Sequence, residues 1–210
     1  MSKTILVCCG TGCLANGSKR VAEAFRQLLE GTEHRVECQV KETGCNGFCE
    51  NGPLVQILPD DITYYKVREK DAAEIVEKTI LAGEPVERLL YKNDQGQRVR
   101  SQGENPFYAP QHKLALRNIG KIEPASVDDY MAHGGYRALK KALGMTGEEI
   151  VREVEISGLR GRGGAGFPTG RKWRTAMEMD CAPKYVACNG DEGDPGAFMD
   201  RSVLEGDPHS

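Results

Sequence analysis

Four cysteines near the start of the sequence are spaced like metal ligands. Cys8 and Cys13 are separated by four residues, and Cys45 and Cys49 are separated by three. Each pair lies in a glycine-containing loop that is expected to follow a β-strand, so the two loops can converge. Glycines let the backbone approach inorganic sulfide closely, and their exposed N–H groups stabilise the negative charge of an iron–sulfur cluster. The spacing therefore favours a cluster held by thiolates from both loops.

Other uses of these cysteines compete with that interpretation. Structural zinc sites prefer cysteine pairs separated by two residues, so the present spacing is a poorer match. Thiol–disulfide exchange requires a Cys-x-x-Cys pair, which the sequence lacks. Cysteines that only fill space in a core are a third alternative. The chain has eight cysteines, and in a cytosolic-looking protein these favour metal or redox chemistry over a disulfide framework.

A glycine-rich loop, residues 157–173, is the second feature that could do chemistry. Its stretch 161–166 satisfies the G-x-G-x-x-G pattern, but a Rossmann site needs a strand directly before the turn. A capping box beginning at Thr146 predicts a helix there instead, so the generic dinucleotide interpretation fails. Five glycines within nine positions, with arginines beside them, still suit a cradle for a phosphate and a ring. An RNA-binding Arg–Gly segment is disfavoured because interleaved aromatics are missing. A solvated surface loop remains as the other alternative.

Hydrophobic periodicity predicts the elements that position these loops. The order β-α-β followed by β-β-α, which is that of a thioredoxin-like fold, is expected in the first part, and the polar stretch 92–112 is interpreted as a linker. In the first part, strands are expected at 4–9, 35–40, 54–58 and 62–67, and helices at 18–30 (with Ser18 as N-cap) and 71–81. After the linker, strands are expected at 113–119 and 185–188, and helices at 128–131, 135–143, from Thr146, and around 170–179.

Charge and hydropathy restrict the partners and the compartment that are expected for the chain. With 28 Lys and Arg against 31 Asp and Glu, the net charge of −3 gives no reason to expect nucleic acid or an anionic membrane as a partner. No apolar run approaches the ~20 residues needed to cross a bilayer. The start of the sequence also lacks the apolar core of a signal peptide. A cytoplasmic protein is therefore expected.

The two cysteine loops, VCCGTGC and TGCNGFC, resemble the thioredoxin-like [2Fe–2S] ferredoxin family, and the resemblance covers residues 1–85. The ligands of that family are spaced C-x4-C and C-x3-C. The resemblance therefore selects Cys8 as the ligand, because the adjacent Cys9 is separated from Cys13 by only three residues. Cys9 and Cys38 are then expected to be buried structural thiols. The implied ligands of a [2Fe–2S] cluster are Cys8, Cys13, Cys45 and Cys49.

The run SGLRGRGGAGFPTGRKW resembles the signature of the flavoprotein subunit of Complex I and its relatives. Among these relatives are the diaphorase subunits of NAD(P)-linked, electron-bifurcating hydrogenases and of formate dehydrogenases. The later stretch CNGDEGDPG resembles the next motif of the same family. The resemblance implies FMN and either NAD(H) or NADP(H) as cofactors, and it assigns no catalytic residue. The implied cofactor-binding residues are Gly161, Arg162, Gly163, Gly164, Gly166, Phe167, Lys172, Asn189, Asp191 and Glu192.

These resemblances imply an α/β chain with three parts: a thioredoxin-like [2Fe–2S] domain at 1–88, a linker at 89–112, and the incomplete start of an α/β FMN/NAD(P)H-binding domain at 113–210. The implied function is electron transfer between NAD(P)H, FMN and iron–sulfur clusters within a soluble complex. Its partners would be iron–sulfur subunits and hydrogenase or formate dehydrogenase subunits. Family members continue well beyond residue 210, so FMN binding is expected to be weak or absent in this chain. A non-enzymatic [2Fe–2S] carrier or docking subunit with a vestigial flavin domain is the alternative.

Overall fold

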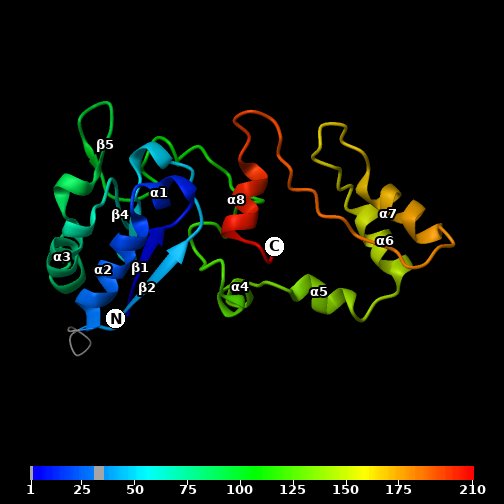
Figure 1. Cartoon of the computed structure of the whole chain (residues 1–210), viewed down its shortest axis with the longest axis horizontal. Helices are drawn as coiled ribbons and strands as arrows, with labels where there is room; N and C mark the ends of the chain where they lie inside the picture. Colours follow the sequence, from blue (N-terminus) through cyan, green and yellow to red (C-terminus); the bar gives the residue numbers. More distant parts are fainter. Residues whose placement is uncertain (1, 31–35) are drawn as a thin grey trace. The chain divides into compact units, whose positions relative to one another are not determined.

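A computed structural model of the chain describes residues 2–30 and 36–210. The chain forms two compact units, which are described separately (Figure 1). The first unit comprises Met1–His133 together with Asp191–Ser210, and the second comprises Gly134–Gly190. The first unit thus takes in the last segment of the sequence as well as the part expected to be thioredoxin-like.

A four-stranded mixed sheet organises the first unit. Its strands are β1 (Lys3–Cys8), β2 (Cys38–Thr43), β3 (Val55–Leu58) and β4 (Ile62–Tyr64), in the order β2-β1-β3-β4. β1 and β2 are parallel, with Cys8 opposite Thr43, whereas β3 runs antiparallel to both β1 and β4. Because β1 and β2 end at the same register position, the loops that follow them leave the sheet at the same edge. Both cysteine pairs are in those loops.

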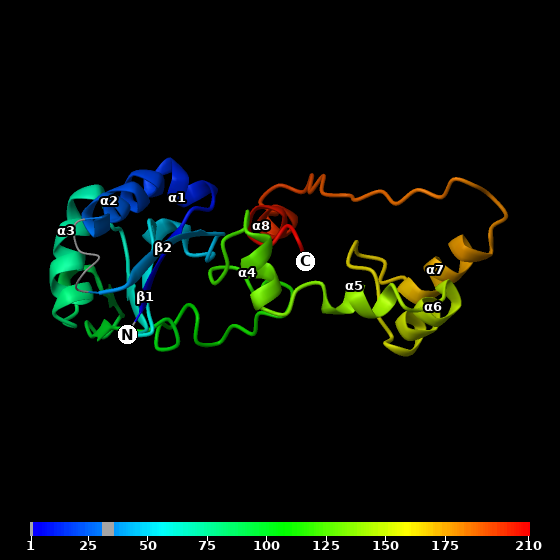
Figure 2. The same cartoon turned by 90° about the horizontal axis from the view of Figure 1, so that it is seen from below.

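Helices cover the sheet and close the main core. α2 (Ser18–Glu30) buries Val21 and Phe25 against the sheet, as its periodicity predicts. Ser18 is the first residue of this helix rather than its N-cap. A second helical segment consists of the short turn η2 (Glu69–Asp71), α3 (Ala72–Ile75) and the wider-wound η3 (Val76–Leu81). α2 and α3 lie side by side (Figure 2). The four strands and two helices predicted in the first part are confirmed, although β2 begins at residue 38 and β4 ends at residue 64. Residue 35 of the predicted strand 35–40 lies outside the described residues.

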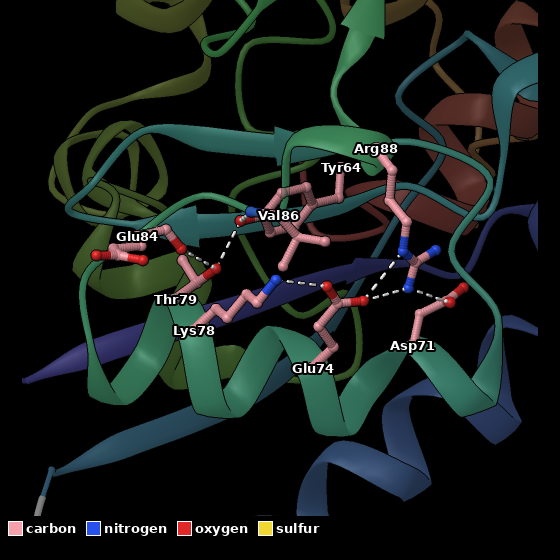
Figure 3. Close-up of polar contacts among 8 residues, drawn as sticks. All are labelled: Tyr64, Asp71, Glu74, Lys78, Thr79, Glu84, Val86 and Arg88. Carbon is pink, nitrogen blue, oxygen red and sulfur yellow. Dashed lines mark hydrogen bonds and ion pairs between the residues drawn. The ribbon is translucent and has the colours of Figure 1, made fainter.

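Polar contacts fix the end of this second helical segment to the sheet (Figure 3). The hydroxyl groups of Tyr64 and Thr79 are 2.6 Å apart, and Val86 N–H donates to the Tyr64 hydroxyl at 2.9 Å. Arg88 forms ion pairs with Asp71 at 2.8 Å and with Glu74. The fully buried side chains of Tyr64 and Thr79 therefore satisfy one another within the core.

The segment interpreted from sequence as a linker pairs with the sheet over part of its length. After the short turn η4 (Glu87–Leu89), Leu90 forms a bridge to Tyr64, and β5 (Tyr91–Lys92) and β6 (Arg98–Val99) form a hairpin. Thr63 N–H also donates to the carbonyl of Arg100 at 2.8 Å. The sequence gives no periodic signal for this pairing, because the strands are only two residues long and lie among glycine and polar residues.

The prediction of a strand at 113–119 is wrong. These residues form turns, in which Leu114 is 82% exposed and Ile119 is 3% exposed. Their apolar side chains do not alternate between the two faces of a strand, so a run of apolar residues here does not produce one. The first unit is completed by α1 (Thr11–Ala15), α4 (Val127–Ala132) and α8 (Met199–Gly206), of which α4 was predicted.

The second unit is helical, with α5 (Arg137–Ala142), α6 (Gly147–Ile156) and α7 (Thr169–Glu178). The predicted capping box is present, since the Thr146 hydroxyl accepts from Glu149 N–H while the Glu149 carboxylate accepts from Thr146 N–H. Arg174 of α7 holds α6 through ion pairs with Glu148 and Glu155 at 3.0 and 2.6 Å.

The prediction of a buried strand at 185–188 is also wrong. Tyr185 is 85% exposed and Val186 is fully exposed. A strand needs a neighbour to satisfy its backbone groups. Residues 134–190, all of which the structure describes, form no sheet with which this segment could pair.

Candidate functional site

The four predicted ligand cysteines come together at one edge of the sheet. Cys8 ends β1, Cys13 lies in α1, Cys45 follows β2, and Cys49 begins the short turn η1 (Cys49–Asn51). The Sγ atoms of Cys45 and Cys49 are 3.6 Å apart. The Cys8 thiol donates to the Gly44 carbonyl at 3.5 Å and interacts with the thiols of Cys13 and Cys45. The parallel register of β1 and β2 thus brings thiols from two distant loops into one cluster.

Two glycines show how closely the cysteine loops approach each other. A Cβ atom on Gly10 would lie 2.5 Å from Cβ of Cys45, and one on Gly52 would lie 2.5 Å from Sγ of Cys13. Neither position tolerates a side chain without displacing a cysteine. The close backbone approach that an iron–sulfur cluster needs is therefore built into the loops.

The donor set fits a cluster with two irons. Four cysteine thiolates are the usual ligands of a [2Fe–2S] cluster. Gly47 N–H donates to Cys45 Sγ at 3.3 Å, which is the kind of backbone donor that stabilises a ligand sulfur. Within the described residues, no three His, Cys, Asp or Glu side chains are arranged to hold a single metal ion.

Mutual contact and burial control the protonation of the thiols. The hydrogen bond with Cys13 raises the pKa of Cys8 to about 11, with burial adding to the rise, whereas the same bond lowers the pKa of Cys13. The contact with Cys8 raises the pKa of Cys45, and burial raises the pKa of Cys49. Four neighbouring thiolates repel one another, so their joint ionisation requires the positive charge of bound metal.

Cys9 and Cys38 occupy a different environment from these four. Both are half-buried and pack against the main core, which contains Val21 and Phe25. Ser18 Oγ contacts Cys9 Sγ at 3.6 Å. Burial raises the pKa of Cys9 to about 12 and that of Cys38 to about 11. This is the environment expected of structural thiols.

An aromatic shell packs over the cysteine loops, and the sequence analysis did not identify it. Phe48, between Cys45 and Cys49, stacks on Phe107 with ring centroids 4.3 Å apart and planes 8° from parallel. Buried Tyr108 packs in the same apolar cluster as Cys8 and Cys13. The members of the shell are Phe48, Tyr65, Tyr91, Phe107 and Tyr108. Phe48 could have been found from its position between two ligands, whereas the others come from segments with no cysteine.

α8 also contacts the cysteine loops. The Thr11 hydroxyl, between Cys8 and Cys13, donates to both carboxylate oxygens of Glu205 at 2.9 and 3.1 Å. Gly44, beside Cys45, meets the backbone of Gly206 so closely that a Cβ on Gly44 would overlap the Cα of Gly206. Buried Asn118 donates to the Asp207 carboxylate at 2.8 Å and ties the end of α8 to the same unit.

The two ends of the glycine loop in the second unit are joined by hydrogen bonds. Gly161 N–H donates to the Phe167 carbonyl at 2.8 Å, Thr169 N–H donates to the Leu159 carbonyl at 2.9 Å, and Arg160 donates to the Gly166 carbonyl. Gly163 and Gly164 have open space where a side chain would be. Most of this loop is exposed, including Arg162 and Phe167. Lys172 is exposed in the first turns of α7. Glycines and cations thus gather here in a form that can receive a phosphate.

The stretch CNGDEGDPG, residues 188–196, is divided between the two units. Asn189 is exposed in the second unit, and Asp191 is exposed in the first. The Glu192 carboxylate accepts the N–H groups of Asp200 and Arg201 at 2.8 and 3.0 Å. These bonds lower the pKa of Glu192, with the Arg201 N–H contributing most. In this structure Glu192 therefore caps the start of α8.

No helix among the described residues is long and apolar enough to cross a membrane.

Together, the mixed sheet and the cluster of four thiols define an iron–sulfur protein of α/β class. A family model described as thioredoxin-like [2Fe-2S] ferredoxin matches residues 2–80, and one described as the Nuo51 FMN-binding domain matches residues 154–210. The first part of the chain thus matches the thioredoxin-like [2Fe–2S] ferredoxin family over residues 2–80, and its last part matches the Nuo51 FMN-binding family over residues 154–210. The resemblances seen in the sequence are thereby confirmed, with [2Fe–2S] and FMN as the cofactors of the two families.

Several known proteins are similar to parts of the chain. It is 60% identical to the HndC component of the NADP-reducing hydrogenase of Solidesulfovibrio fructosivorans over 100 residues, which are 48% of this chain and 20% of HndC. It is 51% identical to the F chain of the NADH-quinone oxidoreductase of Aquifex aeolicus over 96 residues, covering 46% of this chain and 22% of the relative. A thioredoxin-like [2Fe-2S] ferredoxin structure from Aquifex aeolicus is 35% identical with a TM-score of 0.39, covering 41% of this chain and 87% of the ferredoxin. The chain thus spans about a fifth of the length of these curated oxidoreductase relatives.

Proposed function

We propose that this chain transfers electrons within an NAD(P)H-dependent oxidoreductase, between NAD(P)H, FMN and iron–sulfur clusters. The observation that carries the proposal is the convergence of Cys8, Cys13, Cys45 and Cys49 from two loops of a thioredoxin-like sheet. The match of residues 154–210 to an FMN-binding domain supports the flavin half. The names of the relatives support pyridine nucleotide as the electron donor or acceptor.

Each group of residues has a distinct part in this proposal. When bound, FMN exchanges a hydride with a nicotinamide and single electrons with iron–sulfur centres. The four cysteines hold the [2Fe–2S] cluster, and Gly47 N–H stabilises the charge on the Cys45 sulfur. The N–H groups of the loop 161–166 would hold the phosphate of FMN, and Lys172 would supply positive charge beside them. As the family resemblance implies, Asn189, Asp191 and Glu192 would contact hydroxyl groups of flavin or nucleotide.

The domain organisation and setting belong to the same proposal. We place the [2Fe–2S] domain at 1–88, a connecting segment at 89–112 and the start of the flavin domain at 113–210. The partners are further subunits of a multi-subunit redox complex, carrying iron–sulfur centres or a hydrogenase or formate dehydrogenase site. A cytoplasmic setting fits eight cysteines whose spacing suits metal chemistry rather than a disulfide framework.

Anaerobic reconstitution with iron and sulfide tests the cluster. We expect two irons and two sulfides per chain and, on reduction, the EPR signal of a [2Fe–2S] cluster. Cys13→Ala and Cys45→Ala should lose this signal, whereas the matched variant Cys38→Ala should keep it. Stoichiometric zinc without labile sulfide in the protein as isolated would contradict the assignment.

The visible spectrum separates the enzyme from a simple electron carrier. Flavin bands that bleach on addition of NADH or NADPH support the full proposal. Iron–sulfur bands alone would favour a non-enzymatic carrier or docking subunit. One observation favours the carrier: all four cysteines belong to a single unit, with Cys8 and Cys13 buried, whereas the glycine loop is largely exposed.

A further inference from the structure

Tyr108 has a buried hydroxyl group without a partner in the protein. Its side chain is 7% exposed, and its oxygen has no hydrogen-bond partner among the residues that the structure describes. The ring packs in the apolar cluster that contains Cys8 and Cys13, edge-on to Phe48 with centroids 6.0 Å apart. A buried hydroxyl that donates to nothing destabilises the folded state, because it has lost its hydrogen bonds to water. Its location beside two ligand cysteines therefore calls for an acceptor.

The surrounding segment fixes this tyrosine firmly. Asn105, which is fully buried, donates from its side chain to the Tyr65 hydroxyl at 2.8 Å and accepts from Phe107 N–H at 2.9 Å. Tyr108 N–H donates to the Asn105 carbonyl at 2.9 Å. The ammonium of Lys113 lies 5.3 Å from the centre of the Tyr108 ring. The ring is thus held by its own backbone, by the aromatic shell and by a neighbouring cation.

The electrostatic surroundings keep the hydroxyl protonated. Burial raises the pKa of Tyr108. The Tyr108 side chain packs in one apolar cluster with Cys8 and Cys13, so two of the proposed cluster ligands are its neighbours. A protonated hydroxyl next to a negatively charged cluster can only donate.

We propose that the Tyr108 O–H donates a hydrogen bond to a sulfur atom of the cluster held by Cys8, Cys13, Cys45 and Cys49, and thereby raises its reduction potential. The inference rests on the proposed function, because it requires the [2Fe–2S] cluster at these cysteines. The added electron increases the negative charge on the sulfurs, so a donor stabilises the reduced state more than the oxidised state. Tyr108 acts through the cluster as a tuning residue and is not a ligand.

Redox titration of the reconstituted full chain, followed by EPR, tests this role. In Tyr108→Phe we expect the ratio of reduced to oxidised cluster at a fixed potential to fall about three- to tenfold, tenfold being about 59 mV for a one-electron couple. Tyr91→Phe is the matched control, because Tyr91 belongs to the same aromatic shell but is only half-buried. Its potential should equal that of the wild type.

The outcomes separate this inference from the proposed function. Absence of iron and sulfide from the wild type would end the proposed function, whatever the variants do. A cluster of unchanged potential in Tyr108→Phe would overturn the inference alone. A Tyr108→Phe chain that fails to fold or to take up a cluster, while Tyr91→Phe does both, would also overturn it. That result would show that the hydroxyl stabilises the fold rather than tuning the cluster.

Discussion

The hydroxyl of Thr11 donates to both carboxylate oxygens of Glu205, which is 194 positions further along the sequence. Thr11 lies between two proposed cluster ligands, and Glu205 lies in α8, within the match to the FMN-binding family. Gly44 and Gly206 meet at the same place, backbone against backbone. The last segment of the chain therefore packs against the cysteine loops within the first unit.

A methyl group at Gly44 should weaken the packing of α8 against the cysteine loops. In Gly44→Ala the added Cβ overlaps Gly206, and overpacking of this kind costs about 1–3 kcal/mol. Since 1.4 kcal/mol is about a factor of ten, amide hydrogen exchange in Met199–Gly206 should speed up roughly five- to a hundredfold. Gly163→Ala is the control, because a Cβ there meets nothing. Unchanged exchange in α8 would show that this helix does not depend on the contact.

The choice between two adjacent cysteines gives a second prediction. Cys8 contacts Cys13 and Cys45, whereas Cys9 packs against the main core beside Ser18. Cys9→Ser should therefore keep the visible and EPR spectra of the cluster, and Cys8→Ser should lose or alter them. The reverse result would show that the ligand register is shifted by one residue.

Local pattern was sufficient to predict the strands that position the cysteine loops, but not the short helix α1 that carries Cys13, nor the residues that cover the cysteines. β1 and α2 have the periodicity of their type, and the parallel pairing of β1 with β2 then brings Cys8 near Cys45. Phe107 and Tyr108 lie in a polar, proline-containing stretch without periodicity, so their burial depends on Phe48 across the fold. The packing of Gly206 on Gly44 is likewise a tertiary contact between residues far apart in sequence. Such contacts leave no signal in a local window.

The Tyr64 hydroxyl should matter for stability and not for the cluster. Tyr64→Phe leaves the buried Val86 N–H without its acceptor, and Thr79 keeps only its bond to the Glu84 carbonyl (Figure 3). Loss of a buried hydrogen-bond partner costs about 1–3 kcal/mol. Urea denaturation should show this loss, while the visible spectrum of the reconstituted protein stays unchanged. A Tyr64→Phe variant as stable as the wild type would mean that another group satisfies Val86.

The ion pair between Lys41 and Asp129 should make stability depend on pH. Their charged atoms are 2.6 Å apart, and each side chain is 17% exposed. Burial acts to raise the pKa of Asp129, but hydrogen bonds from Lys41 and from Glu123 N–H outweigh it and lower this pKa. The carboxylate therefore contributes its full stability above the unfolded pKa of about 3.9, and this is lost as pH falls through the lower folded value.

Urea denaturation from pH 7 to pH 3 checks this dependence. Asp129→Asn should be less stable than the wild type by about 1.5–3 kcal/mol at pH 7, since it loses a hydrogen bond between charged groups. The difference should shrink towards pH 3. Glu23→Gln is the control, because Glu23 forms an exposed pair with Arg26 that contributes at most about 1 kcal/mol. A difference that is constant over this range would exclude the charge of Asp129 as its source.

FMN should bind this chain weakly through the glycine loop. Arg162 and Lys172 are exposed, and Phe167 is 49% exposed, so the loop can hold a phosphate but buries little of an isoalloxazine ring. If the loop supplies half of a typical nanomolar affinity, about −6 kcal/mol remains, which corresponds to a Kd of tens of micromolar. Titration calorimetry should give this value for the wild type and weaker binding for Lys172→Glu, because a carboxylate there repels the phosphate. Lys19→Glu, an equal charge change on α2, should leave the affinity unchanged. Submicromolar binding would mean that residues of this chain enclose the flavin ring as well as its phosphate.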